Sequence, residues 1–196
     1  MNIYTGIGSR ETPPDVYALM VALASLLARA GWTLRSGAAD GADSAFEQGC
    51  DAASGKKEIF LAWRGFNGST SERYRVSSEA LEMASTLHPA WERLGQGPRK
   101  LHARNCNQVL GDNLDNPSHA VICWTKDGCE TRKQRTNLTG GTGTAIVLAD
   151  IKGVPVFNLK NDASRERLAQ WLLARGVNTE GLELVRAPQA RQSDLF

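Results

Sequence analysis

The sequence has few of the features that direct a chain to a membrane or through one. No apolar run approaches the roughly 18 residues needed to cross a bilayer. Residues 1–6 lack the basic and apolar segments of a signal peptide. We therefore expect a cytoplasmic protein with no membrane partner.

Cysteine and histidine are also scarce and widely spaced. The four cysteines include no C-x-x-C pair, and the three histidines, His88, His102 and His119, are scattered. A structural metal site needs ligands at short, regular spacing, so we expect no metal and free, buried thiols in a reducing compartment.

An excess of one charge is missing as well. The chain has 23 Lys and Arg against 21 Asp and Glu, a formal net charge of +2. Such a balance does not by itself indicate a nucleic-acid partner. Only a local cluster of basic residues would favour nucleic-acid binding. Arg132, Lys133 and Arg135 form one in a charged loop, and Arg64 and Arg104 are further basic candidates. The alternative for the loop is simple solvation.

What is present is an alternation of short apolar runs with helical patterns. In a chain of 196 residues this predicts one α/β domain, a Rossmann-like open and mostly parallel sheet with helices on both faces. The domain is expected over 1–178, followed by a C-terminal tail over 179–196. Strands are predicted at 2–6, 32–35, 57–63, 120–125 and 154–159, and helices at 13–30, 42–53, 78–87, 99–110, 143–151 and 162–175, with a short helical segment after Pro89.

Three glycine-bearing bends follow or precede these runs, at 6–10, 36–43 and 139–144. Ligands of open α/β sheets bind beyond the carboxyl ends of the strands. A bend at the start of a helix can leave backbone N–H groups facing an anion. We therefore expect the bends to hold the phosphate and ribose of a ligand. The predicted ligand-binding residues are Gly8, Ser9, Arg10, Ser36, Gly37, Ala38, Asp40, Asp43, Gly140, Gly141, Thr142, Gly143 and Thr144.

Several of these residues have a structural alternative. Arg10 can pair with a phosphate through two parallel hydrogen bonds, or remain solvated. Asp40 and Asp43 can accept from a ribose hydroxyl or a base, or one of them can cap the following helix.

Aromatic and polar residues near the same strand ends are further candidates. Trp63 and Trp124 end two predicted strands, where an indole could stack on a base or pack in the core. His102, Arg104 and Asn105 lie near the start of a predicted helix and could face the same edge of the sheet.

Taken together, the motifs resemble those of the SMF/DprA–LOG (SLOG) superfamily. The matching segments are Gly8-Ser9-Arg10, the run 36–43, and Gly140-Gly141-Thr142-Gly143-Thr144. The resemblance covers about residues 2–175 and is closest to stand-alone DprA-like proteins of phages and prophages. It implies a cytosolic protein of a bacterium or a phage-infected host, and self-association as a dimer or larger oligomer.

The resemblance implies different functions in different branches. DprA proteins bind single-stranded DNA and help to load a recombinase in DNA recombination. LOG proteins are phosphoribohydrolases with a catalytic glutamate within three residues of their glycine motif, where this chain has Ala145, Ile146 and Val147. We therefore expect binding of a nucleotide or nucleotide derivative without turnover, no cofactor, and no identifiable catalytic residue. The alternatives are a DNA-recombination mediator and an enzyme that cleaves an N-glycosidic bond.

Overall fold

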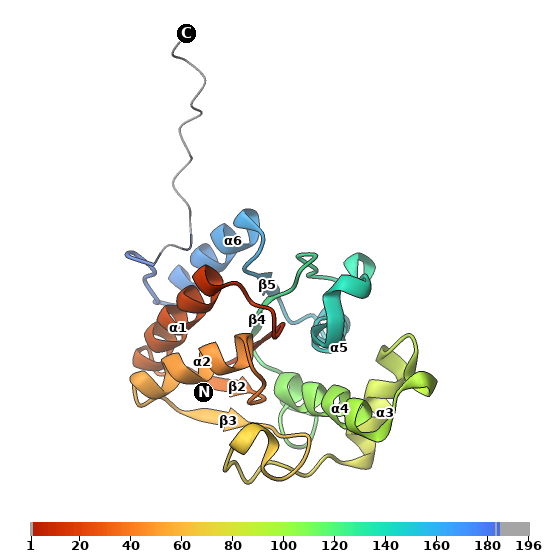
Figure 1. Ribbon diagram of the computed structural model, residues 1–196. Coiled ribbons are helices and arrows are strands. Elements are labelled where there is room, and N and C mark those ends of the chain that lie inside the picture. The colour runs from red at the N-terminus through yellow and green to blue at the C-terminus, as the bar shows by residue number, and fades with distance from the viewer. Residues whose placement is uncertain (1, 183, 185–196) are drawn as a thin grey trace.

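The computed structural model describes residues 2–182 and 184, and most of the expected tail over 179–196 lies outside them (Figure 1). Five parallel strands form one sheet in the order β3-β2-β1-β4-β5. This confirms the predicted open parallel α/β sheet. The strands are β1 (Ile3–Gly8), β2 (Thr33–Ser36), β3 (Lys57–Ile59), β4 (Ala120–Trp124) and β5 (Val156–Asn158).

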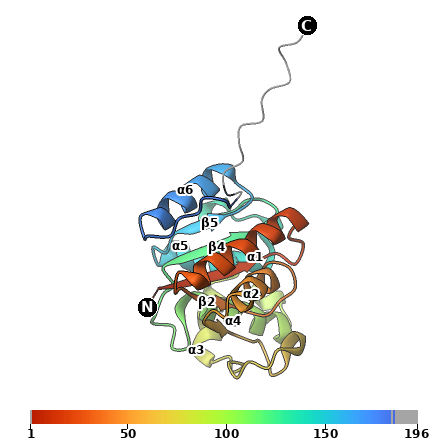
Figure 2. The same ribbon diagram turned by 90° about the vertical axis from the view of Figure 1, so that its left-hand side faces the viewer.

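Helices cover both faces of the sheet. The α-helices are α1 (Pro14–Arg29), α2 (Ala42–Ala52), α3 (Ser78–Leu87), α4 (Gln96–Leu110), α5 (Gly143–Ile151) and α6 (Asp162–Leu173). Short 3-10 helices are η1 (Phe66–Gly68), η2 (Trp91–Arg93), η3 (Arg132–Gln134) and η4 (Asn137–Thr142). Helices α1, α2 and α6 lie on one face, seen in front of the sheet in Figure 2, and α3, α4 and α5 lie on the other.

The apolar spacing of α1 explains why it packs as it does. Leu19, Met20, Leu23 and Leu27 recur at helical intervals and are buried against the sheet. On the strands, alternate side chains enter opposite layers, so Ile122 packs with α1 while its neighbours in β4 pack with α3, α4 and α5. The two apolar layers are therefore separated by the sheet itself.

Strand β3 is shorter than the predicted 57–63. Phe60 N–H still donates to Ser36 O, but Leu61 N–H donates to Arg73 O in the following loop. The chain leaves the sheet there because its next backbone partner belongs to a loop and not to β2.

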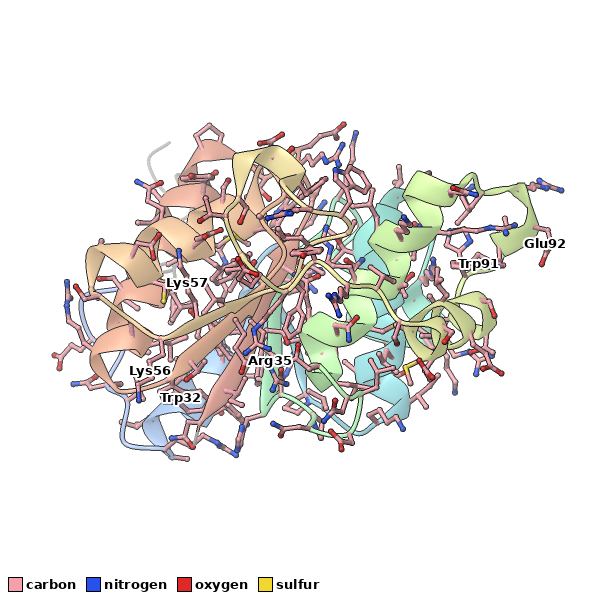
Figure 3. All side chains as sticks on the ribbon, turned by 90° about the horizontal axis from the view of Figure 1, so that it is seen from below. Trp32, Arg35, Lys56, Lys57, Trp91 and Glu92 are labelled. Atoms are coloured by element: carbon pink, nitrogen blue, oxygen red, sulfur yellow. The ribbon has the colours of Figure 1, made fainter. Side chains whose placement is uncertain are left out.

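Buried Arg35 has a structural role away from the carboxyl edge of the sheet. Its guanidinium donates to Glu58 at 2.6 Å and to the carbonyl of Asn116 at 2.6 Å. Figure 3 labels Arg35 among the side chains seen from below the molecule. These contacts join β2, β3 and the segment before β4.

All four cysteines are free and buried, as predicted. Within the described residues, no helix combines the length and apolar character that a membrane span requires.

Strands β2 and β3 follow β1 on one side of the sheet, whereas β4 and β5 lie on its other side, so the strand order reverses between β1 and β4. Gly8 and Trp124 pair in register at the carboxyl ends of these strands. From there the chain passes from β1 to α1 on one face, and from β4 through 125–142 to α5 on the other. Such a divergence opens a crevice at the edge of the sheet, the usual place for a ligand.

Candidate functional site

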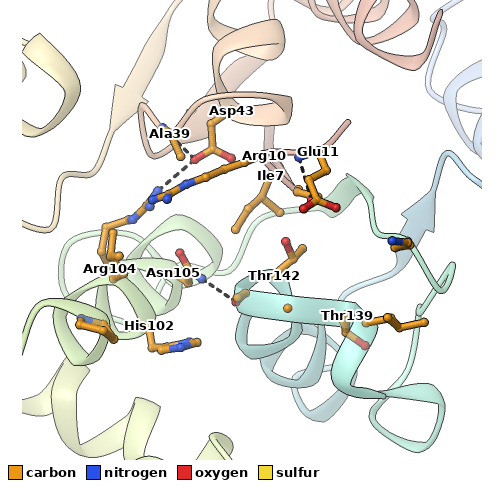
Figure 4. Close-up of a pocket in the computed structure, with 18 of the residues that line it drawn as sticks. Ile7, Arg10, Glu11, Ala39, Asp43, His102, Arg104, Asn105, Thr139 and Thr142 are labelled. Atoms are coloured by element: carbon orange, nitrogen blue, oxygen red, sulfur yellow. Dashed lines mark hydrogen bonds and ion pairs between the residues drawn. The ribbon is translucent and has the colours of Figure 1, made fainter. Parts of the chain in front are cut away.

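A cavity of about 580 Å³ lies at this crevice, between the β1–α1 loop, α4 and η4 (Figure 4). It brings together residues from all three glycine-bearing bends. The predicted residues that line it are Gly8, Ser9, Arg10, Asp43, Arg104, Gly140, Gly141 and Thr142, together with His102 and Asn105. The bends therefore converge on one edge of the sheet.

The bend before α5 forms an exposed part of the cavity wall. Gly140 has a φ of +62°, which favours glycine, and a Cβ atom at Gly140 or Gly141 would have no neighbour within 4 Å. Asn105 Nδ2 donates to Gly141 O at 3.0 Å and fixes the bend to α4. The N–H of Gly143 donates back to the carbonyls of the bend, so that amide is not free for a ligand.

The bend over 36–43, by contrast, is largely engaged in its own structure. Ser36 Oγ donates to Gly6 O at 2.8 Å, and Ala42 N–H at the start of α2 donates to Ser9 O at 3.2 Å. The backbone amide at the start of α2 is therefore occupied by the β1–α1 loop and is not available to a ligand. From this bend, Ala39 and Asp43 line the cavity, whereas Ser36, Gly37, Ala38 and Asp40 do not.

A buried ion pair joins α2 to α4 at the cavity. Asp43 Oδ2 accepts from Arg104 Nη1 at 3.0 Å, and the two residues are 1% and 4% exposed. Burial raises the pKa of Asp43, while Arg104 and the amides of Ala39 and Gly8 act in the opposite direction. Burial likewise lowers the pKa of Arg104, and Asp43 opposes that change.

Gly37 is required by this ion pair. A Cβ atom there would overlap Arg104 Nη1 and would lie 2.8 Å from Gln108 Nε2. The glycine of this bend therefore makes room for the arginine, and its role is packing and not contact with a ligand in the cavity.

Cationic side chains line the cavity on both sides of the crevice. Arg10, exposed after β1, lies near enough to Arg104 for its charge to lower the pKa of that guanidinium. Lys126 lines the cavity from the loop after β4, and sequence reasoning did not single it out. Its position directly after the predicted strand at 120–125 was the available signal. Glu11 is the nearby opposing charge in the lining.

His102 is held neutral beside the cavity. Its Nδ1 lies 2.8 Å from the hydroxyl of buried Thr144, and its ring centroid is 4.4 Å from that of His88. Burial, followed by His88, Arg135 and Arg104, lowers the pKa of His102 to about 4. The hydroxyl of Thr144 is therefore occupied by the imidazole of His102. Thr144 also does not line the cavity.

Asp127 organises the loop that carries the glycine bend. Its Oδ2 accepts from the hydroxyls of Thr136 at 2.6 Å and Thr139 at 2.5 Å, and its Oδ1 accepts from the hydroxyl of Thr125 at 2.8 Å. These bonds lower the pKa of Asp127 to about 2 against the opposing effect of burial. We call Asp127 and these three threonines the Asp127 clamp. The sequence did not predict it, because its threonines lie up to 12 positions from Asp127 in the chain.

Neither candidate tryptophan lines this cavity. Trp63 is 41% exposed and packs edge-on against Phe66, while Trp124 is 8% exposed within the core. The apolar part of the lining comes instead from Ile7, Ala39, Pro98, Leu101 and Leu138.

The predicted basic residues of the loops also lie outside the cavity. Arg132 and Lys133 are exposed on η3, and Arg64 lies over the ring of Tyr74. Arg135 is half-buried and donates to Leu87 O at 2.8 Å. Among these five basic candidates, Arg104 alone reaches the cavity.

Across 2–182 and 184, no group of three or more His, Cys, Asp and Glu side chains is arranged to hold a metal ion. Comparison of the chain with protein-family models, with curated proteins and with solved structures gives no match. The geometry of the cavity is therefore the main guide to function.

Proposed function

We propose that the cavity binds a nucleotide or a nucleotide-derived small molecule, with its phosphate between Arg10 and the open bend at Gly140 and Gly141. The observation that supports this most is the meeting of that bend and Arg10 in one cavity at the carboxyl ends of β1 and β4. An accessible glycine backbone allows close approach of a phosphate, and an arginine can bind it through two hydrogen bonds.

The charges around the cavity support an anionic ligand. Asp43 and Arg104 neutralise one another as a buried pair. Arg10 and Lys126 then face the single opposing charge of Glu11, which leaves the lining with an excess of positive charge. In a partly enclosed site, such an excess favours phosphate over a neutral ligand.

The size and apolar side of the cavity support a ligand larger than phosphate. A volume of about 580 Å³ falls within the range typical of small-molecule sites. Leu138 is 58% exposed at this wall and offers apolar surface to a base, together with Pro98 and Leu101. In our proposal, the ligand lies with its phosphate at the bend and its base on these side chains.

We further propose that the chain is a SLOG-type protein that binds its ligand without cleaving it. The positions at which LOG proteins place a catalytic glutamate carry Ala145, Ile146 and Val147, and all three are buried in α5. Glu47, an acidic residue of α2, pairs with Lys57 outside the cavity. The described lining contains two carboxylates, Glu11 and Asp43, and Asp43 is already paired with Arg104.

Calorimetric titration with a panel of nucleoside monophosphates tests the proposal. We expect Arg10→Ala to weaken binding about 10-fold, the loss of roughly 1.4 kcal/mol from a phosphate contact. Arg64→Ala removes the same side chain from an exposed position outside the cavity and should leave affinity unchanged.

Three outcomes would contradict this function. The first is failure of every nucleotide to bind. The second is release of free base during incubation, which would favour a phosphoribohydrolase. The third is single-stranded DNA binding that falls steeply with salt and is lost on substitution of Arg132 and Lys133, which would favour a recombination mediator.

A further inference from the structure

The buried ion pair at the cavity leaves one acceptor unused. Arg104 Nη1 donates to Asp43 Oδ2, whereas Asp43 Oδ1 accepts no hydrogen bond from any described residue. The Asp43 side chain is only 2% exposed, so bulk water does not satisfy this oxygen. A buried carboxylate oxygen without a donor is costly, and such atoms are rare in folded proteins.

The position of this oxygen connects it with the cavity. Asp43 is part of the cavity lining, and Figure 4 shows the interaction that joins its carboxylate to Arg104. Arg104 anchors the carboxylate from the other side, which fixes the orientation of the unused oxygen. The wall of the cavity therefore contains a carboxylate whose orientation is fixed.

The chemistry of an unused carboxylate oxygen restricts what it can bind. It accepts from O–H or N–H groups and repels phosphate oxygens. Arg10, the proposed phosphate ligand, interacts electrostatically with the guanidinium that holds Asp43. Asp43 therefore lies beside the cationic end of the cavity, and the part of a nucleotide next to its phosphate is the sugar.

We propose that Asp43 Oδ1 accepts a hydrogen bond from a sugar hydroxyl, so that the cavity selects ribonucleotides over deoxyribonucleotides. This inference rests on the proposed function, because it assumes that a nucleotide phosphate is bound nearby. It adds a specificity determinant that the glycine bend and Arg10 do not provide, since both contact only phosphate in that proposal.

The test is a comparison of adenosine monophosphate with its 2′-deoxy, 3′-deoxy and 2′,3′-dideoxy analogues on the wild-type protein. We expect the dideoxy analogue to bind at least about 10-fold more weakly, because a hydrogen bond to a buried charged group is lost. Purine riboside monophosphate, which lacks the amino group of the base, should bind as tightly as adenosine monophosphate.

Two variants separate the role of Asp43 from general destabilisation. In Asp43→Asn the ribo-to-dideoxy ratio should fall to about 2-fold or less, because a neutral amide accepts a weaker hydrogen bond. Gln108→Met is the control: Gln108 also has buried, unpaired side-chain atoms, but it lies outside the cavity lining. Its ratio should match that of the wild type.

The wild-type measurement remains decisive if Asp43→Asn does not fold. Equal affinity for the ribonucleotide and its dideoxy analogue would overturn this inference and leave the proposed function intact, as would a preference that follows only the amino group of the base. A wild-type preference that Asp43→Asn retains in a folded protein also overturns it. Binding of none of these nucleotides would instead overturn the proposed function itself.

Discussion

The side-chain amide of Asn105 donates to the carbonyl of Gly141 at 3.0 Å. This bond joins α4 to the glycine bend before α5, across 36 positions of sequence. It is a structural link between the helix that carries Arg104 and the backbone that we propose to contact phosphate. The shape of the bend should therefore depend on this amide.

Replacing Asn105 with Ala should weaken nucleotide binding about 3- to 10-fold and lower the free energy of unfolding by about 1 kcal/mol, because one partly buried hydrogen bond is lost. Asn107→Ala provides a matched comparison. Asn107 is also buried in α4, but its amide donates to Gly111 O at 3.0 Å and to Asp112 O at 3.3 Å, away from the cavity lining. Calorimetry and urea unfolding should show a similar loss of stability for both variants and a loss of affinity for Asn105→Ala alone. Equal affinities in both variants would contradict a role for this link.

Two glycines should respond to substitution in opposite ways. Gly141→Asp places a charged side chain in open space, so the free energy of unfolding should change by less than about 0.5 kcal/mol while nucleotide binding is lost through charge repulsion. Gly37→Ala should cost about 3 kcal/mol, because its methyl group displaces the Arg104 guanidinium from Asp43. Urea unfolding with nucleotide titration measures both. Unchanged binding by Gly141→Asp would show that the phosphate lies elsewhere.

The Asp127 clamp should make stability depend on pH in acid. Its pKa falls from an ordinary 3.8 to about 2 in the folded protein, so the carboxylate stabilises the fold above about pH 4. That contribution is lost as the pH falls from about 4 towards 2. Asp127→Asn should cost roughly 1–2 kcal/mol at pH 7 through the weakened threonine hydrogen bonds. Between pH 4 and pH 2, it should lose less stability than the wild type.

Urea unfolding at several pH values measures this effect, with Asp115→Asn as a control for removing a charge at an exposed position. The clamp would have no energetic role if Asp127→Asn and Asp115→Asn gave the same stability curves from pH 7 to pH 2.

Local pattern was sufficient to predict the layered fold. The recurrence of Leu19, Met20, Leu23 and Leu27 marks one face of a helix, and short apolar runs mark strands buried on both sides. Parallel pairing follows because a helix lies between successive strands. The predicted end of β3 was wrong. The N–H of Leu61 donates to Arg73 O and not to β2, and Arg73 lies 12 positions further along the chain.

The sequence by itself determined the sheet, its helical layers and the edge at which the glycine bends meet, because these depend on periodicity and on residues close in the chain. Only the tertiary structure decided what each bend does. In the folded protein, the first N–H of α2 donates to Ser9 O, and Arg104 occupies the space next to Gly37. The bend at Gly141, by contrast, lines the cavity. Those outcomes depend on contacts between residues far apart in sequence, and local composition does not specify which glycine accommodates a neighbour and which one lines the cavity.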